Sequence, residues 1–336
     1  LRIDREIGEQ TDLRVRGTAR YASHRERTDE KPDELLYSQL LVGAAAEVEQ
    51  RTGKVTLRAG AGYEGATTPE TGDAVERDGD HEYVVQGAVE GGFREDGRWH
   101  LNASRRPRMP SLRELYSDAL STFEPNDALE PEIQDAFEAG ASWSASRWNL
   151  SLNGFWQQID GAIERTTVVV APGETVRKRV NLDEVRNLGI EVGTVLKPVR
   201  GLSFDLQGTW LYSRARDADG SYDRRVEDRP DWIATLAGTW THRSGLRLRA
   251  ELDGIGERYS LDETRTDPDD PYRELDATAR VNLRFSWRHF AEVGGYAGCE
   301  WFVRVDNILD QVTWSQTGLA ESGRMLQAGV LVDFDR

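Results

Sequence analysis

His100 and Ser104 form the one pair of side chains in this 336-residue chain whose types suggest catalysis. A histidine beside a serine can act as the base that activates a nucleophile. Positions i and i+4 of a strand, however, lie about 13 Å apart, which is too far for direct proton transfer. The sequence also has no Gly-x-Ser-x-Gly, no His-Glu-x-x-His, no phosphate loop and no dinucleotide fingerprint. We therefore expect no catalytic residue, and an outer-membrane hydrolase remains a minor alternative that loss of activity on His100→Ala would support.

Two acidic segments have the density of oxygen ligands that a calcium site needs. They are Asp217-x-Asp219-Gly220-x-x-Asp223 and Asp267-x-Asp269-Asp270, and neither is followed by the distal Glu of an EF-hand loop. The five histidines are scattered over the sequence, at positions 24, 81, 100, 242 and 289. We interpret both segments as solvated acidic loops, and expect neither a metal site nor a cofactor.

The composition excludes several classes of protein. A net charge of -16, from 43 Lys and Arg against 59 Asp and Glu, argues against nucleic acid as a partner, because phosphate contacts need clustered basic residues. Cys299 is the single cysteine, so an internal disulfide is impossible. No run of about 18 apolar residues is present that could form a membrane helix. A membrane strand needs only about 9–11 residues with alternate ones apolar, so a membrane protein built of strands is still possible.

Five tight turns divide the chain, each between two segments of alternating apolar and polar residues. They are Arg51-Thr52-Gly53, Glu95-Asp96-Gly97, Ser144-Ala145-Ser146, Val199-Arg200-Gly201 and Arg243-Ser244-Gly245. Between successive tight turns the chain makes one long polar excursion. Short turns at one end and long loops at the other are typical of an outer-membrane β-barrel.

The alternation itself has a strict period of two. In residues 275–287, for example, Leu, Ala, Val, Phe and Trp share one face while Asp, Thr, Arg, Asn and Ser share the other. A soluble sandwich also alternates, but charged residues in mid-strand favour a water-filled lumen. The pattern predicts an all-β fold: an antiparallel transmembrane β-barrel with about 14 strands present in residues 1–336, and with no helical period.

The last strand fixes the expected orientation. With the C-terminus in the periplasm, the tight turns lie there too, and the long segments lie outside the cell. These expected extracellular segments are residues 65–81, 107–133, 159–184, 215–230, 259–273 and 310–323. The turn at residues 289–298 is longer than the other periplasmic turns.

Aromatic residues are expected in two roles. Tryptophans in strands or at their ends suit the membrane interface, because indole has apolar faces and one donor that needs water or a headgroup. They are Trp99, Trp143, Trp148, Trp156, Trp210, Trp232, Trp240, Trp287 and Trp301. Loop aromatics are the candidates for stacking on a ligand, namely Tyr116, Phe123, Tyr222, Tyr259, Tyr272 and Trp314.

Four motifs in residues 105–334 resemble, in the expected order, those of TonB-dependent outer-membrane receptors. The first is Leu129-x-Pro131-Glu132, preceded by the segment from Arg106-Pro107 to Tyr116. The second runs from Asn181 to Asn187-Leu188-Gly189-Ile190-Glu191, and the third is Val305-Asp306-Asn307-Ile308-Leu309-Asp310. The fourth is Gly323-Arg324 followed by a strand that ends at Phe334, although Asp335-Arg336 follow where the family ends on the aromatic.

The resemblance implies a receptor for TonB-energised uptake of a scarce nutrient, with a ferric siderophore or another iron complex as the usual substrate. Its implied partners are outer-membrane lipid, a plug domain and through it TonB, and the barrel-assembly machinery. A complete receptor of this family has 22 strands and a plug. We therefore expect residues 1–336, which begin at Leu1 without an initiator Met, to be the C-terminal part of the barrel, with the plug and first strands absent.

Several signature residues have a plain structural explanation. Asn307 and Asp310 can cap backbone groups freed at a turn. Pro107 and Pro110 cannot donate to a sheet, so residues 112–116 are expected to form a loop packed above the barrel. The alternatives to a receptor are a plugless channel complete at about 14 strands, and a soluble all-β sandwich that would fold in buffer without detergent.

Overall fold

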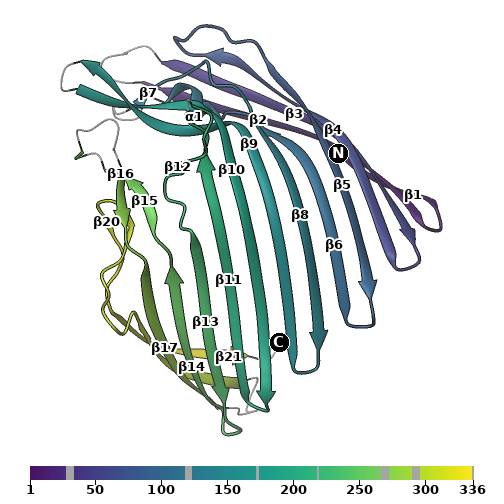
Figure 1. Ribbon diagram of the computed structural model, residues 1–336, viewed down its shortest axis with the longest axis vertical. Coiled ribbons are helices and arrows are strands. Elements are labelled where there is room, and N and C mark those ends of the chain that lie inside the picture. The colour runs from purple at the N-terminus through teal and green to yellow at the C-terminus, as the bar shows by residue number, and fades with distance from the viewer. Residues whose placement is uncertain are drawn as a thin grey trace.

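One antiparallel sheet dominates the structure, a computed structural model (Figure 1). The described residues are 1–27, 34–117, 123–171, 174–217, 219–262, 264–265, 272–289 and 296–334. The long strands are β1 (Arg2–Gly8), β2 (Thr11–Glu26), β3 (Leu35–Thr52), β4 (Val55–Thr71), β5 (Asp80–Phe93), β6 (Gly97–Arg108), β8 (Glu132–Ala145), β9 (Trp148–Ala171), β10 (Glu174–Val199), β11 (Leu202–Ala215), β13 (Trp232–Thr241), β14 (Leu246–Ile255), β17 (Thr278–His289), β18 (Tyr296–Asp306) and β21 (Met325–Phe334). The short elements are α1 (Leu112–Tyr116), β7 (Phe123–Glu124), β12 (Arg224–Arg225), β15 (Arg258–Leu261), β16 (Tyr272–Leu275), β19 (Trp314–Gln316) and β20 (Leu319–Ala320).

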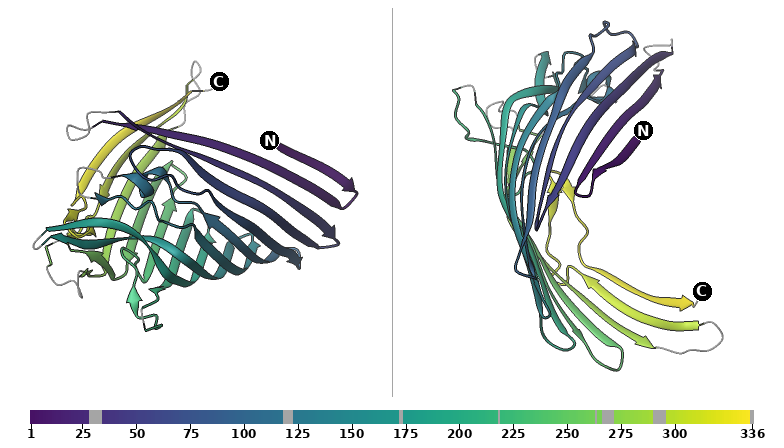
Figure 2. Two further views of the ribbon diagram at one scale, coloured as in Figure 1. Left: turned by 90° about the horizontal axis from the view of Figure 1, so that it is seen from above. Right: turned by 90° about the vertical axis from the view of Figure 1, so that its right-hand side faces the viewer.

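The long strands follow one another through the sheet in chain order, each antiparallel to the next. The register runs from the β1–β2 pair to the β18–β21 pair. Among the described residues, β1 and β21 each have a long-strand partner on one side only, and the sheet curves into an open trough (Figure 2). The fold of a β-barrel wall is confirmed, with one long strand more than the expected 14 or so.

All five predicted tight turns connect neighbouring long strands at one end of the trough. The β13–β14 turn shows why glycine is needed there. Gly245 has a φ of +87°, and a Cβ at this position would lie 2.0 Å from the carbonyl oxygen of Arg288. The backbone N–H of Arg288 donates to the carbonyl of Gly245 at 3.0 Å, so this turn also aligns the adjacent strand β17.

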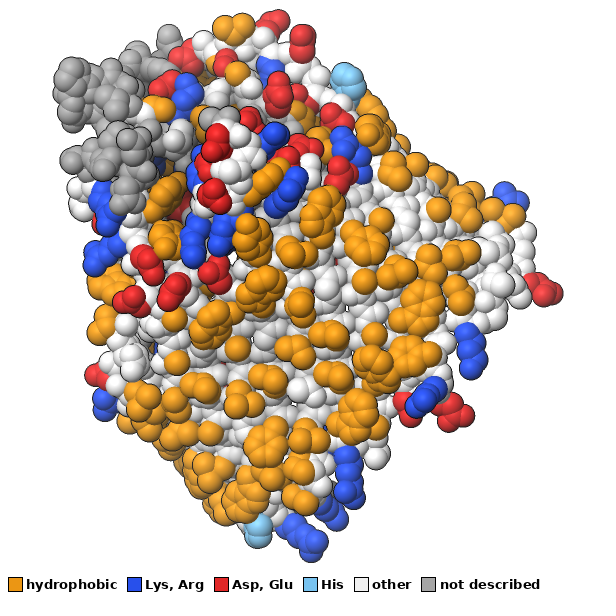
Figure 3. Space-filling view, viewed as in Figure 1, with side chains coloured by type: hydrophobic (Ala, Val, Ile, Leu, Met, Phe, Trp, Pro, Cys, Tyr) orange, Lys and Arg blue, Asp and Glu red, His pale blue; other side chains and the backbone are white. Residues whose placement is uncertain are grey.

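The convex face of the trough carries the apolar side chains of every long strand from β2 onward. These side chains form an apolar band, which is continuous over the strands that face the viewer in Figure 3. Two aromatic belts border this band. Trp148 and Trp156 on β9 stand eight residues apart, as do Trp232 and Trp240 on β13. At about 3.3 Å per residue that spacing is about 26 Å along the strand, which suits the ~25 Å apolar band of an outer-membrane barrel.

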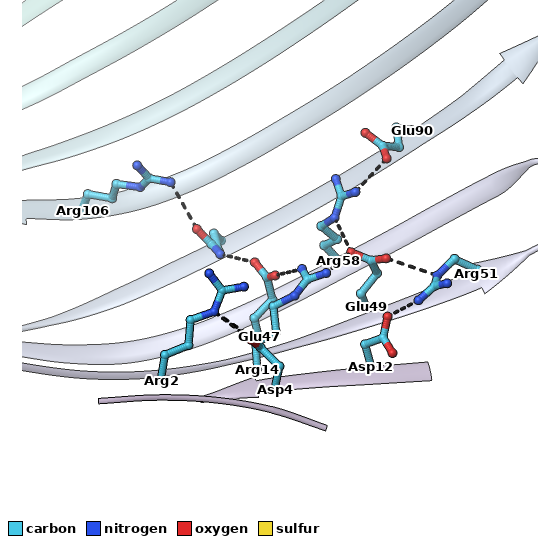
Figure 4. A network of polar contacts seen from close by, with 11 residues as sticks. Arg2, Asp4, Asp12, Arg14, Glu47, Glu49, Arg51, Arg58, Glu90 and Arg106 are labelled. Carbon is cyan, nitrogen blue, oxygen red and sulfur yellow. Dashed lines mark hydrogen bonds and ion pairs between the residues drawn. The ribbon is translucent and has the colours of Figure 1, made fainter. Parts of the chain in front are cut away.

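The concave face is lined by charged side chains that pair across the strands (Figure 4). Arg58 on β4 shows the pattern, since its guanidinium lies 2.9 Å from Glu49 on β3 and 2.7 Å from Glu90 on β5. Glu49 is buried and Arg58 is partly exposed, so the pairs neutralise charges on this wall. Their consequence is that the inner wall is hydrophilic, as a water-filled lumen requires.

Two expectations about the extracellular end were wrong. Residues 159–184 are not a loop, because β9 and β10 continue as one hairpin with an unbroken register through most of that segment. At 24 and 26 residues these strands are far longer than the 9–11 or so that cross a bilayer, so they project beyond the membrane. Residues 112–116 are not a loop either but the helix α1, whose capping box at Ser111 and Glu114 was overlooked.

The other expectations about this end need only short comment. The segments 215–230, 259–273 and 310–323 contain short strands and turns between long strands, as expected. The turn at 289–298, the acidic residues 267–270 and the final Asp335-Arg336 lie largely or wholly outside the described residues. In the part of the chain that is described, no helix is long and apolar enough to cross a membrane.

Candidate ligand-binding site

Helix α1 is held at the extracellular end of the trough by a short chain of charged residues. The Ser111 hydroxyl accepts from the backbone N–H of Glu114 at 3.4 Å, and the Glu114 carboxylate accepts from the backbone N–H of Ser111 at 2.9 Å. Arg108 lies 2.9 Å from the same carboxylate and 2.5 Å from that of Glu132. Burial alone would raise the pKa of Glu114, but these hydrogen bonds outweigh it and the pKa is lowered.

The Leu-x-Pro-Glu motif packs beneath this helix. Leu129 is completely buried, against Leu115 and Tyr116 of α1 and Tyr37 of β3. The rings of Tyr37 and Tyr116 stack with centroids 5.3 Å apart. The motif therefore joins residues that are nearly 100 positions apart into a small apolar core above the lumen.

Asn181 on β10 fixes the backbone of the same motif. Its side-chain amide donates to the carbonyls of Glu130 at 3.0 Å and Gly161 at 2.6 Å, and its carbonyl oxygen accepts from the N–H of Glu130 at 3.0 Å. Glu132 makes a second connection by accepting from the N–H of Ile163 at 2.7 Å. Two signature segments are thus bound to each other and to the β9–β10 hairpin.

A group of basic residues lies beside α1. We define the basic patch as Arg113, Arg165, Arg177 and Arg179 together with Phe123. The guanidinium of Arg179 lies 4.5 Å from the centre of the Phe123 ring and donates to the carbonyl of Arg113 at 3.1 Å, while that of Arg177 is 5.7 Å from the ring. Burial lowers the pKa of Arg179, the charge of Glu114 partly opposes this, and the charges of Arg113 and Arg165 lower the pKa further.

Arg179 is a partly buried member of the basic patch. In the described part of the chain, no carboxylate lies at ion-pair distance from it. Its neighbour Lys178, by contrast, lies 2.5 Å from Glu124. A partly buried cation under repulsion from other cations is stabilised by any anion that reaches it.

Three loops form a second body, which we call the loop lobe: residues 219–231, the β15–β16 hairpin and the β19–β20 hairpin. Buried Arg258 donates to the carbonyl of Trp314, and the side chain of Gln316 donates to Asp228 at 2.8 Å. The N–H of Asp228 donates to the carbonyl of Tyr259 at 2.8 Å. Each loop is thus hydrogen-bonded to at least one of the others.

The loop lobe meets the basic patch at Arg165, which lies 3.3 Å from Glu227. Glu164 precedes Arg165 on β9 and lies beyond Trp156, the outward-facing residue at the edge of the apolar band. Burial raises the pKa of Glu164, and the nearby Glu227 and Glu132 raise it further. Burial likewise raises the pKa of Tyr272. The contact between the loop lobe and the basic patch therefore contains a carboxyl group, that of Glu164, whose ionisation is unfavourable.

The six candidate ligand-stacking aromatics occupy different surroundings. Tyr116 is only 5% exposed and belongs to the core under α1. Phe123 belongs to the basic patch. Tyr222 and Tyr259 each carry an arginine over the ring, Arg186 at 4.0 Å and Arg225 at 4.6 Å.

The remaining two candidates, Tyr272 and Trp314, lie in the loop lobe with Tyr259. Trp314 is 41% exposed and Tyr272 is half-buried. The structure thus groups four candidates in the loop lobe (Tyr222, Tyr259, Tyr272 and Trp314) and two near α1, and a ligand role for any of them remains a prediction.

The strand signatures have structural contacts. The buried Asn187 accepts from the hydroxyl of Ser213 at 2.7 Å, and Glu191 accepts from Asn153 at 3.4 Å. Gly189 leaves room for the ring of Phe155, which a Cβ would approach to 2.3 Å. These contacts fix the pairing of β10 with β9 and β11.

The signature after β18 forms the capped turn that was expected. The side chain of Asn307 donates to the carbonyl of Gln311 at 2.8 Å and accepts from its N–H at 3.0 Å. Asp310 accepts from the N–H of Arg324 at 2.8 Å, and a Cβ on Gly323 would lie 3.0 Å from the same carboxylate oxygen. Strand β21 then ends at Phe334.

The residues considered for catalysis or metal binding are engaged in other contacts or lie apart from one another. His100 lies 2.8 Å from Glu138 on the inner wall, in a cross-strand pair. Asp217 lies 3.7 Å from Arg224, and Asp219 accepts from the N–H of Ser221 at 2.9 Å. Among the described residues, no group of three His, Cys, Asp or Glu side chains converges as a metal site would require.

Sequence reasoning missed the basic patch. Its residues come from three separate segments, and only the hairpin that replaces the expected loop at 159–184 brings them together. A signal was present nonetheless, since Arg177 and Arg179 alternate on one face of a segment that reads as a strand.

Comparison with known proteins agrees with this geometry. Residues 9–308 match the family described as TonB dependent receptor-like, beta-barrel. Among solved structures, the FrpB iron transporter of Neisseria meningitidis (F5-1 variant) superposes with a TM-score of 0.76 at 17% identity, covering 98% of this chain and 54% of that one. The ferric yersiniabactin receptor FyuA of Yersinia pestis gives 0.64 at 13% identity, covering 96% and 51%. BauA, the ferric preacinetobactin receptor of Acinetobacter baumannii, gives 0.69 at 14%, covering 99% and 53%.

These matches concern the fold and about half of the length of the solved structures. At such identities the solved structures show a common fold, and the chain spans about half of their length. The matched family and the structures are receptors and transporters rather than enzymes. No curated protein sequence matches the chain at a significant level.

Proposed function

The chain belongs to the family of TonB-dependent receptor β-barrels of the outer membrane, and from this premise we propose that it forms the wall and ligand-capturing mouth of a receptor for an anionic iron complex, most simply a ferric siderophore. Binding and translocation are the activity. No covalent bond is made or broken.

The observation that carries the proposal is the basic patch. Arg179 is partly buried, is repelled by Arg113 and Arg165 and stacks on Phe123, so an anion with a planar group satisfies both the charge and the ring. Ferric complexes of catecholates and hydroxycarboxylates have this combination of negative charge and planar groups. The names of the matched FyuA and BauA structures, both receptors for ferric siderophores, support the same class.

Energised uptake is the second part of the proposal. It requires a plug domain that fills the lumen and contacts TonB, together with strands that close the wall. The open edges of β1 and β21 and the hydrophilic concave face are what such strands and such a plug need. Residues 1–336 are assigned to the barrel alone.

A binding comparison tests the substrate class. The purified receptor is titrated with a ferric catecholate, ferric citrate and a neutral ferric hydroxamate. We expect Arg179→Gln to weaken binding of the two anionic complexes about tenfold, the loss of one charge-assisted hydrogen bond, and to leave the neutral complex unchanged. Arg200→Gln, in a tight turn at the opposite end, is the matched control. Equal affinity of all three complexes for the unmodified receptor would refute the assignment.

A further inference from the structure

The convex face of the sheet has an apolar groove unrelated to the mouth. It crosses β3 to β8 and has a volume of about 460 Å³. Its floor is made of small residues, Ala59, Gly87 and Ala103, and its sides of larger outward-facing ones: Val48, Leu57, Val89, Leu101 and Phe137. A cavity of about 150 Å³ holds one benzene ring, so this groove has room for a much longer hydrocarbon segment.

The groove lies in the half of the apolar band nearest the short turns. Trp99, whose indole packs over Gly91, stands at its lower border, in the belt on that side. Leu57 is three residues from Lys54 in the β3–β4 turn, or about 10 Å along the strand. A chain seated in the groove therefore has its polar end beside that turn.

The short-turn end is basic, although the whole chain carries a net charge of -16. The six described short turns and the strand residues beside them hold nine Lys and Arg residues against five Asp and Glu: Arg51, Lys54, Arg94, Arg98, Arg147, Lys197, Arg200, Arg243 and Arg247, against Glu6, Glu9, Asp12, Glu95 and Asp96. Figure 3 shows such basic side chains along the lower edge, beneath the apolar band. We call this edge the basic rim.

Two members of the basic rim lie beneath the groove. Lys54 and Arg94 are exposed and belong to adjacent turns, which are joined by a hydrogen bond of 3.2 Å from the N–H of Gly92 to the carbonyl of Lys54. Glu95 and Asp96 lie in the same turn as Arg94. In the turn of Lys54, Arg51 is already paired with Asp12. Lys54 makes no ion pair among the described residues, so its ammonium is available to an anion.

From the groove, its position and the basic rim we propose that this face binds an anionic phospholipid of the leaflet on the short-turn side, with an acyl chain in the groove and the phosphate at Lys54 and Arg94. The leaflet is periplasmic in the orientation that the sequence predicts, with the short turns in the periplasm. The lipid contact itself does not depend on which substrate is transported.

Native mass spectrometry of the receptor purified from outer membranes tests the site. The protein is exchanged into detergent and titrated with phosphatidylglycerol or phosphatidylethanolamine carrying identical acyl chains. We expect phosphatidylglycerol to be retained about 25-fold more tightly, which is about fivefold for each of the two basic residues. Lys54→Gln should reduce that preference about fivefold, the usual effect of one basic residue near an anionic lipid surface, and adding Arg94→Gln should remove it.

A matched pair of substitutions tests the groove. Ala59→Leu fills its floor and should lower retention of both lipids, while Ala250→Leu, at an equally outward-facing alanine of β14, should change neither. Arg243→Gln controls for charge in a distant turn. Equal retention of the two lipids by the unmodified receptor, or equal behaviour of Ala59→Leu and Ala250→Leu, would overturn the proposal. Because the readout is lipid retention, a negative result leaves the uptake function standing, and loss of uptake leaves the lipid site standing.

Discussion

Asn181 offers the sharpest test of how the mouth is built. Its side chain makes three hydrogen bonds to the backbones of Glu130 and Gly161, and no other side chain in the described residues connects the Leu-x-Pro-Glu motif to β10 in this way. Asn181→Ala removes all three. It leaves the packing of Leu129 in place, so the expected effect is local opening of the segment before β8 rather than loss of the barrel.

The size of the effect follows from the number of bonds. At about 1 kcal/mol for each hydrogen bond the segment loses about 3 kcal/mol of protection. Since about 1.4 kcal/mol corresponds to a factor of ten, the backbone amide of Glu130 should exchange with solvent about 100-fold faster. The exchange of amides in β13 and β14, far from this contact, should stay the same.

Hydrogen–deuterium exchange with peptide-level mass spectrometry measures this directly. Asn149→Ala is the matched control, because Asn149 also bonds β10, accepting from the N–H of Val195 at 2.8 Å, but at the opposite end of the sheet. Acceleration of less than threefold at Glu130 in Asn181→Ala would refute the reasoning. So would equal acceleration there in Asn149→Ala.

Three further predictions concern charge, sterics and the turns. Burial holds the pKa of Glu164 above its ordinary value, so the contribution of this carboxyl group to the stability of the fold is present at low pH and is lost as the pH rises through the raised pKa. Glu164→Gln should therefore raise the melting temperature at pH 7.5 but not at pH 4. A change in melting temperature that does not depend on pH would contradict this. Gly189→Ala places a methyl group against the ring of Phe155 and the carbonyl oxygen of Trp210 and should lower the yield of folded barrel on heat-modifiability gels. Adding Phe155→Ala should restore part of the yield, because only the clash with Trp210 is left; no rescue at all would argue against the clash with the ring. Gly245→Ala should destabilise the β13–β14 turn more than Ser244→Ala does, measured by denaturant titration, because the turn needs a positive φ and the added Cβ meets the carbonyl of Arg288.

Much of the wall could be predicted from sequence because the rule that builds it is local. Alternation in residues 246–252 or 275–287 places each side chain on one face of the sheet, whatever the distant strands do. Three of the five tight turns have a local requirement of the same kind, since Gly53, Gly201 and Gly245 have positive φ. The nine tryptophans could be assigned to strands or their ends on the same basis, and all nine lie in strands.

The mouth could not be predicted in the same way, because its contacts join distant segments. The 159–184 hairpin was missed because its polar residues were interpreted as a loop. Above the membrane, however, two strands that pair with each other need no apolar face. Tyr116 could not be recognised as a core residue without knowing that Tyr37 and Leu129 surround it. The pKa of Arg179 is lowered mainly by burial in the assembled mouth, and Arg113 and Arg165, which lie 66 and 14 residues earlier in the chain, lower it further while Glu114 raises it.

Uptake of iron by living cells tests the central claim most directly. A strain lacking its own siderophore receptors is given the receptor gene, and radiolabelled ferric catecholate uptake is measured with TonB present, with TonB deleted, and with Arg179→Gln. The account predicts uptake that requires TonB and that falls about tenfold in Arg179→Gln at limiting substrate. Uptake that continues at the same rate without TonB would instead indicate a passive channel, and would contradict the proposed function.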